Sequence, residues 1–231
     1  QVNPLFAGVK TEGEPWRRGD ETGAFPRDIE SLFKYDLIIL GDVPASYFSA
    51  DQLSLVRDQV AARGAGLLWL AGDGTPRSYD GTMLADLLPM RRPGSVNRWE
   101  TPRGGAARVQ PTPLAEALGV LRLSDGQGVI AAGWPRDLPS LWWVQDMGLL
   151  KPPVEALAGA IAADGSSVPL VTRLRYGAGQ SVYVATDETW RWREGRGELY
   201  FEQFWMQMIQ MLGRGRLEEQ GRRLWLGVSH S

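Results

Sequence analysis

Three stretches of the chain decide its fold: Asp36-Leu-Ile-Ile-Leu-Gly-Asp42, Leu67-Leu-Trp-Leu-Ala-Gly-Asp73 and Ser181-Val-Tyr-Val-Ala-Thr-Asp-Glu188. Each is a short apolar run, which is typical of a β-strand buried on both faces of a parallel sheet. Each also ends on an acidic residue. Because ligands of open α/β sheets bind beyond the carboxyl ends of the strands, we expect the functional residues of this chain among these acids.

The segment between the first two strands predicts a helix over residues 50–63. Ser49 and Gln52 have the spacing of a capping box, in which two side chains satisfy free backbone donors at a helix start. Gly64 is suited to the left-handed residue that ends a helix. Residues 37–71 therefore predict a strand, a crossover helix and a second, parallel strand.

The carboxyl-terminal part predicts a hairpin followed by a helix. Residues 170–176 and 180–185 are rich in β-forming residues, and a glycine-rich turn joins them. Residues 198–212 carry a wide apolar stripe at helical spacing, which must be buried on the sheet. Residues 223–228 have the composition of a further strand.

The domain organisation follows from which segments have clear strand or helix patterns and which do not. We interpret residues 1–213 as one α/β domain, with an irregular insertion at 90–150. Within that insertion the sequence predicts short strands over Ala106–Val109 and Leu141–Val144 and a helix over Leu114–Leu118. Residues 1–27 predict mostly extended chain or loop, with a weak strand around Val2–Val9, and residues 214–231 predict a linker and the start of a following domain.

Composition excludes several classes of function. The 231 residues are 43% hydrophobic, which is enough for a substantial core. A formal net charge of −2 gives no field that attracts nucleic acid. The chain has no Cys, and its one His is His230. Thiolate chemistry, histidine metal sites and Ser-His-Asp catalysis are therefore not expected, and neither is a cofactor. No apolar run reaches the length of about 18 residues that a membrane span needs, so we expect no direct membrane insertion by this fragment.

The acids at the strand ends have two interpretations. Asp42, Asp73, Asp187 and Glu188 have the oxygen ligands that Mg²⁺ or Ca²⁺ prefers, and one of them is able to act as a base toward water. Asp is also common after strands because its side chain accepts from free backbone N–H groups. No motif spacing supports a metal, so we favour the structural role and expect neither a metal site nor a catalytic residue.

The segment that follows the third strand interleaves aromatic and cationic residues. Trp190 and Arg191 have the composition of a cation–π contact or of a stacking surface for a ligand. A structural ladder of Trp and Arg over a loop, paired with nearby acids, is the alternative that we favour. A carbohydrate or peptide binder that uses Trp190 and Trp192 remains a further hypothesis.

Four stretches together resemble a known family: Tyr35–Val43, Arg63–Gly72, Gly81–Pro89 and the region from Tyr176 to Arg193. They are similar to the class I glutamine amidotransferase-like domain of large bacterial membrane proteins. Those proteins also carry von Willebrand factor A-type or aerotolerance-regulator-type segments. The resemblance implies an α/β, flavodoxin-like three-layer sandwich, with a mostly parallel sheet and an antiparallel hairpin at one side.

The same resemblance denies the family's activity to this chain. A working class I amidotransferase has a Cys on the elbow after a central strand and a His-x-Glu pair after a late strand. The matching positions here are Gly72-Asp73-Gly74 and Thr186-Asp187-Glu188, which supply no thiol and no imidazole. Because covalent catalysis needs a nucleophile and a base, the resemblance implies a pseudoenzyme.

The leading hypothesis is therefore a non-catalytic binding or interaction module, a soluble domain of a membrane-anchored bacterial protein. Its partners would be other domains of the same polypeptide, a protein partner, or a small polar ligand. The ligand-binding candidates are Asp42, Asp73, Asp187, Glu188, Trp190 and Arg191. The second hypothesis is a carboxylate-dependent hydrolase, assisted by a divalent metal, that uses the same acids.

Overall fold

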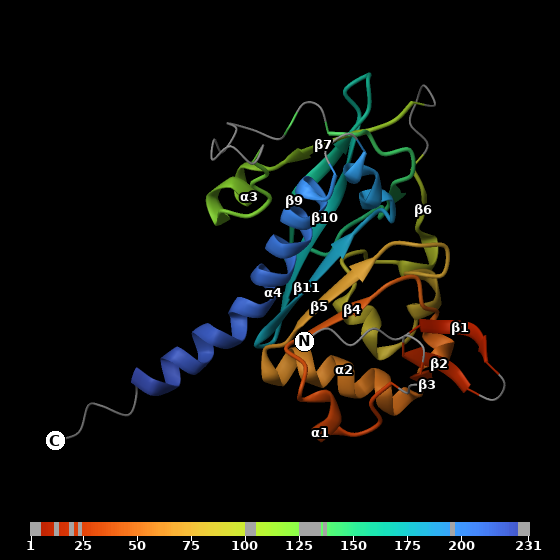
Figure 1. Ribbon diagram of the computed structural model, residues 1–231, viewed down its shortest axis with the longest axis vertical. Coiled ribbons are helices and arrows are strands. Elements are labelled where there is room, and N and C mark those ends of the chain that lie inside the picture. Colours follow the sequence, from red (N-terminus) through yellow and green to blue (C-terminus); the bar gives the residue numbers. More distant parts are fainter. Residues whose placement is uncertain are drawn as a thin grey trace.

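The computed structural model describes residues 6–11, 14–18, 21–22, 25–99, 105–124, 135, 138–194 and 197–225. Its centre is a six-stranded sheet in the order β4-β5-β11-β10-β9-β7 (Figure 1). The strands in that order are β4 (Leu37–Leu40), β5 (Gly66–Leu70), β11 (Gly179–Val184), β10 (Ser167–Tyr176), β9 (Val154–Ile161) and β7 (Arg108–Pro111).

The sheet is mixed, and this corrects the expected fold class. β4, β5 and β11 pair in parallel, whereas β11 with β10, β10 with β9, and β9 with β7 pair antiparallel. The expectation of a flavodoxin-like sandwich with a mostly parallel sheet is therefore wrong. The expected hairpin is present as β10 and β11, but β9 and β7 extend it into half of the sheet. β7 lies in the region interpreted as an irregular insertion and overlaps the short strand expected over Ala106–Val109.

The crossover between β4 and β5 forms as its sequence predicts. Helix α2 (Ala50–Arg63) begins with a complete capping box, in which Ser49 and Gln52 each accept from the other's backbone N–H. It ends at Gly64, whose φ of 74° lies in the left-handed region that favours glycine.

Helices α2 and α4 (Leu199–Trp225) cover opposite faces of the parallel half. The side chain of Gln180 on β11 donates to the Met211 carbonyl on α4, with an Nε2–O distance of 2.8 Å. A Cβ placed on the preceding residue, Gly179, would lie 2.6 Å from the Val60 carbonyl of α2. Because successive residues of a strand point to opposite faces, the two helices lie on opposite sides of the sheet.

Helix α4 confirms the predicted carboxyl-terminal helix and extends beyond it. Phe204, Met208 and Leu212 are buried on the body of the protein. The helix then continues away from the sheet to Trp225, as Figure 1 shows. The strand expected over residues 223–228 is therefore wrong as far as Trp225, and its last three residues lie outside the described residues.

Shorter elements surround the sheet. The remaining strands and helices are β1 (Phe6–Thr11), β2 (Glu14–Arg18), β3 (Glu21–Thr22), α1 (Ile29–Leu32), η1 (Ala45–Tyr47), η2 (Arg77–Tyr79), η3 (Met83–Leu87), η4 (Pro93–Ser95), β6 (Asn97–Arg98), α3 (Pro113–Leu118), β8 (Gln145–Asp146) and the 3₁₀-helix η5 (Glu188–Arg193). The strand expected over Leu141–Val144 is wrong, because only Leu141 forms a bridge, with Ala107. No helix in the described part of the chain combines the length and the apolar character that crossing a bilayer requires.

Candidate functional site

Asp42, at the end of β4, fastens the loop that follows β5. Its Oδ1 accepts from the backbone N–H groups of Gly74 (2.8 Å) and Thr75 (2.9 Å), and its Oδ2 accepts from that of Asp73 (3.1 Å). A Cβ on Gly72 would lie 2.1 Å from the Asp42 Cγ, so the loop can approach this closely only because residue 72 is glycine. The Asp42 carboxylate is thus a structural acceptor for a neighbouring loop.

Asp73 and Asp187 lie at the ends of the two neighbouring strands, and both are exposed. Partial burial raises the pKa of Asp187, and the carboxylates of Glu188, Asp42 and Asp73 raise it further. The four acids therefore lie near enough to interact electrostatically. However, no three acidic or histidine side chains within the described ranges are arranged to hold a metal ion.

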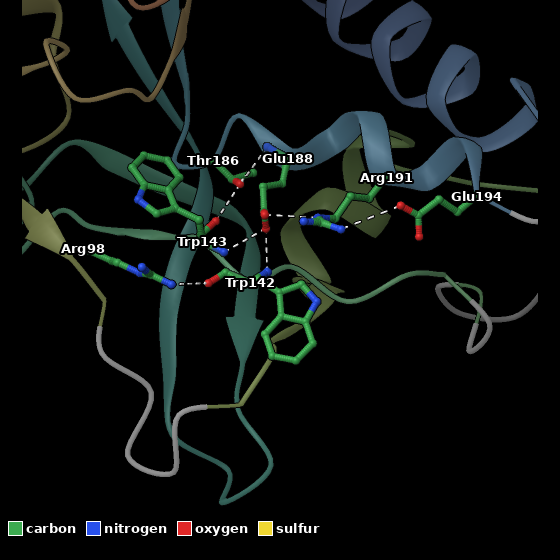
Figure 2. Close-up of polar contacts among 7 residues, drawn as sticks. All are labelled: Arg98, Trp142, Trp143, Thr186, Glu188, Arg191 and Glu194. Carbon is green, nitrogen blue, oxygen red and sulfur yellow. Dashed lines mark hydrogen bonds and ion pairs between the residues drawn. The ribbon is translucent and has the colours of Figure 1, made fainter.

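Glu188 is the buried member of this set and lies at the start of η5. Its Oε2 accepts from the backbone N–H groups of Trp142 (2.5 Å) and Trp143 (2.8 Å), and its Oε1 accepts from the Arg191 Nε (3.1 Å), as Figure 2 shows. The Thr186 hydroxyl donates to the Trp143 carbonyl at 2.7 Å. Glu188 and Thr186 therefore attach the segment before β8 to the turn that follows β11.

Arg98 and a second contact of Arg191 extend this network. Arg98 Nη2 donates to the Trp142 carbonyl at 3.0 Å, and Arg191 Nη1 lies 3.7 Å from the Glu194 Oε1 (Figure 2). The Arg191 guanidinium also lies over the Trp190 ring, 4.6 Å from its centroid. Arg191 is therefore shared between two glutamates and an exposed aromatic ring.

The two tryptophans that the sequence grouped together have different environments. Trp190 is 49% exposed, whereas Trp192 is 0% exposed and packs edge-on against Phe204 of α4 at a centroid distance of 4.9 Å. A 3₁₀-helix has three residues per turn, so positions two apart point to different sides and positions three apart coincide. The hypothesis of a binder that uses both Trp190 and Trp192 is therefore wrong for Trp192.

The sequence missed two features beside the site. Trp142 is 57% exposed and lies in an apolar run that predicted a strand. Beneath the loop held by Asp42, the buried Gln145 donates to the Thr75 carbonyl at 3.1 Å and accepts from the hydroxyl of Tyr183. Burial, and then the charge of Asp42, raise the pKa of Tyr183 well above its ordinary value. No local pattern marks Gln145, because its partners are distant in sequence.

We expect Asp187→Asn to stabilise the folded protein at neutral pH. Since the pKa of Asp187 is raised in the folded state, ionisation of this carboxyl favours the unfolded state. Below the pKa of Asp187 in the unfolded state, its carboxyl is protonated and does not destabilise the fold. The destabilisation develops as pH rises and is complete above the pKa of Asp187 in the folded state. Thermal melts of both proteins at pH 7 and pH 3 measure the effect. If Asp187→Asn stabilised the protein equally at pH 7 and at pH 3, ionisation of Asp187 would not be the cause.

The fold and these contacts define a class of protein: an α/β chain with a mixed six-stranded sheet, whose strand-end acids at Asp42 and Glu188 hold backbone amides. No family model and no curated protein matches the chain.

Solved structures show where the fold recurs. The chain is similar to the cytoplasmic protein STM1381 from Salmonella typhimurium LT2, with a TM-score of 0.58, 22% identity, and coverage of 81% of this chain and 76% of that one. It is also similar to the cytoplasmic protein STM3548 from Salmonella typhimurium, with a TM-score of 0.55, 16% identity, and coverage of 82% and 76%. At these identities the likeness concerns the fold alone. The likeness to the exo-β-1,4-mannosidase Op5Man5 from Opitutaceae bacterium strain TAV5 has a TM-score of only 0.39, at 16% identity over 76% of this chain and 25% of that one.

Proposed function

We propose that this chain is a non-catalytic binding module. The observation that carries the proposal is the use of the strand-end carboxylates: Asp42 accepts three backbone N–H groups and Glu188 accepts two. A carboxylate whose lone pairs are occupied by fixed amides is poorly placed to act as a nucleophile or as a base.

The composition supports the same proposal. The chain has no Cys, and its one His, His230, lies outside the described residues. The relationship to the glutamine amidotransferase-like domain, and with it the membrane-anchored bacterial host protein, enters the proposal from the sequence resemblance alone. The partner would then be another domain of the same polypeptide, a separate protein or a small polar ligand.

A carboxylate-dependent hydrolase is the second candidate, and one observation favours it. The raised pKa of Asp187, an exposed acid beside Asp73, is the direction of shift that a general acid requires. The same shift follows from repulsion among structural acids, so we rank this candidate below the binding module.

Two measurements on the purified chain test the proposal. We expect no glutamine turnover, and no rise in melting temperature with Mg²⁺, Ca²⁺ or Mn²⁺. A metal that binds only the folded state must stabilise it, by about 2.7 kcal/mol at 100 times its dissociation constant. A saturable rise that is lost in Asp187→Asn and retained in Asp164→Asn, an acid of the β9–β10 turn, would favour the hydrolase and overturn the binding module.

A further inference from the structure

An unbroken series of contacts connects the two exposed tryptophans beside the strand ends. Arg98 donates to the Trp142 carbonyl, the Trp142 N–H donates to Glu188, Glu188 pairs with Arg191, and Arg191 lies over the Trp190 ring. We call these five residues, Arg98, Trp142, Glu188, Arg191 and Trp190, the tryptophan–arginine strip. It brings together two segments that are 46 residues apart at the Trp142–Glu188 contact.

The strip presents its aromatic rings on a fixed backbone. Trp142 is held on both sides of its Cα, since its N–H is bound by Glu188 and its carbonyl by Arg98. The Trp190 ring lies against the Arg191 guanidinium, which Glu188 holds in turn. Preorganised aromatic side chains lose little conformational freedom when a ligand stacks on them, so the strip is suited to binding.

The charges of the strip select against a polyanion. Arg191 is paired with Glu188 at 3.1 Å and with Glu194 at 3.7 Å, so its positive charge is compensated. Arg98 and Arg191 of the strip, with Glu188 and the neighbouring Glu194, carry two positive and two negative charges, and the chain as a whole carries −2. A nucleic acid or an acidic polymer would therefore gain no electrostatic attraction here.

The composition of the strip also differs from that of a protein interface. A stable protein interface buries about 800 Å² on each partner and has a continuous apolar centre. The exposed large hydrophobic side chains of the strip are its two indoles, and charged side chains connect them. Two exposed indoles connected through donors and acceptors fit a ligand that alternates apolar faces with hydroxyl groups.

We propose that the tryptophan–arginine strip binds a neutral oligosaccharide. The C–H face of a sugar ring would stack on each indole, and its hydroxyls would donate to the exposed Glu194 and accept from Arg98 or Arg191. This inference rests on the proposed binding function and gives it a ligand class.

The test is a titration of the ¹⁵N-labelled protein with five neutral hexasaccharides: cellohexaose, xylohexaose, mannohexaose, maltohexaose and chitohexaose. We expect at least one to shift the indole N–H resonances of Trp142 and Trp190 saturably. Trp142→Ala and Trp190→Ala should each weaken that binding about tenfold, equivalent to about 1.4 kcal/mol, because each removes one stacking face. Leu149→Ala, at a 77% exposed residue outside the strip, is the matched control and should bind unchanged.

Three outcomes would overturn the proposal. The first is no indole shift with any of the sugars at concentrations up to about 10 mM, beyond the millimolar limit of weak binding. The second is full binding in the Trp142→Ala/Trp190→Ala double variant. The third is a shift of the same resonances by a proline-rich decapeptide and by none of the sugars. That result would show that the strip binds a polypeptide and not a sugar.

Chromatography of the sugars after the titration separates this inference from the proposed function. Intact sugar without binding would end the oligosaccharide proposal and leave the non-catalytic module in place. Cleaved sugar would overturn the non-catalytic module itself.

Discussion

Replacing Trp192 by alanine is expected to lower the free energy of unfolding by about 4 kcal/mol. The side chain is 0% exposed and packs edge-on against Phe204, which connects η5 to the buried face of α4. Its removal leaves a cavity of indole size at this junction, and the surrounding helix can close it only in part. Urea unfolding of the variant and the parent protein measures the difference.

Trp190→Ala is the matched control, because it removes the same side chain two residues earlier in the same 3₁₀-helix. Trp190 is 49% exposed, and its contact with Arg191 is at the surface, so we expect a loss of no more than about 0.5 kcal/mol. Equal losses in the two variants would contradict the different environments of these tryptophans.

The parallel half of the sheet follows from local sequence patterns. The apolar run of β4, the capping box at Ser49, the left-handed Gly64 and the apolar run of β5 lie within 34 residues and agree with one another. Each of these features depends on residues close together in the sequence. The apolar pattern, the helix cap and the glycine conformation all indicate the same strand-helix-strand unit. The hairpin of β10 and β11 is local in the same sense.

The antiparallel half does not follow from such patterns. β7 pairs with β9, and the Val109–Ala160 match of that pair spans a region with many Gly and Pro residues. The sequence indicated a strand near β7, but so short a run does not show which strand it pairs with or in which direction. The choice between a mostly parallel and a mixed sheet therefore depends on long-range pairing, which the sequence does not display.

The sequence indicated where the candidate site lies, at the strand ends, but not which contacts its residues make. A backbone-binding role for Asp42 was predictable, but its donors belong to the loop after β5 and not to the residues that follow Asp42. The separation of Trp190 from Trp192 was not predictable without knowing that residues 188–193 form a 3₁₀-helix. Trp142 was missed because an apolar run does not reveal which of its side chains faces solvent.

Glu188→Ala is expected to destabilise the folded protein by about 3 kcal/mol. The change removes the acceptor of the Trp142 and Trp143 N–H groups and of the Arg191 Nε in a partly buried position, and leaves Arg191 only its contact with Glu194. Unsatisfied buried donors cost about 1–3 kcal/mol each, and partial access of water to Arg191 reduces the sum. Chemical denaturation gives the total, and hydrogen exchange at the two tryptophan amides reports the local loss of protection.

Glu188→Gln separates the contribution of the hydrogen bonds from that of the charge. Both tryptophan amides are bound by the same oxygen, Oε2, so a glutamine that places its carbonyl oxygen there keeps both hydrogen bonds. Only the ionic contact with Arg191 is then lost, and we expect a cost of about 1 kcal/mol with the amides still protected. If glutamine were as damaging as alanine, the Glu188 charge, and not its acceptor geometry, would hold the segment before β8.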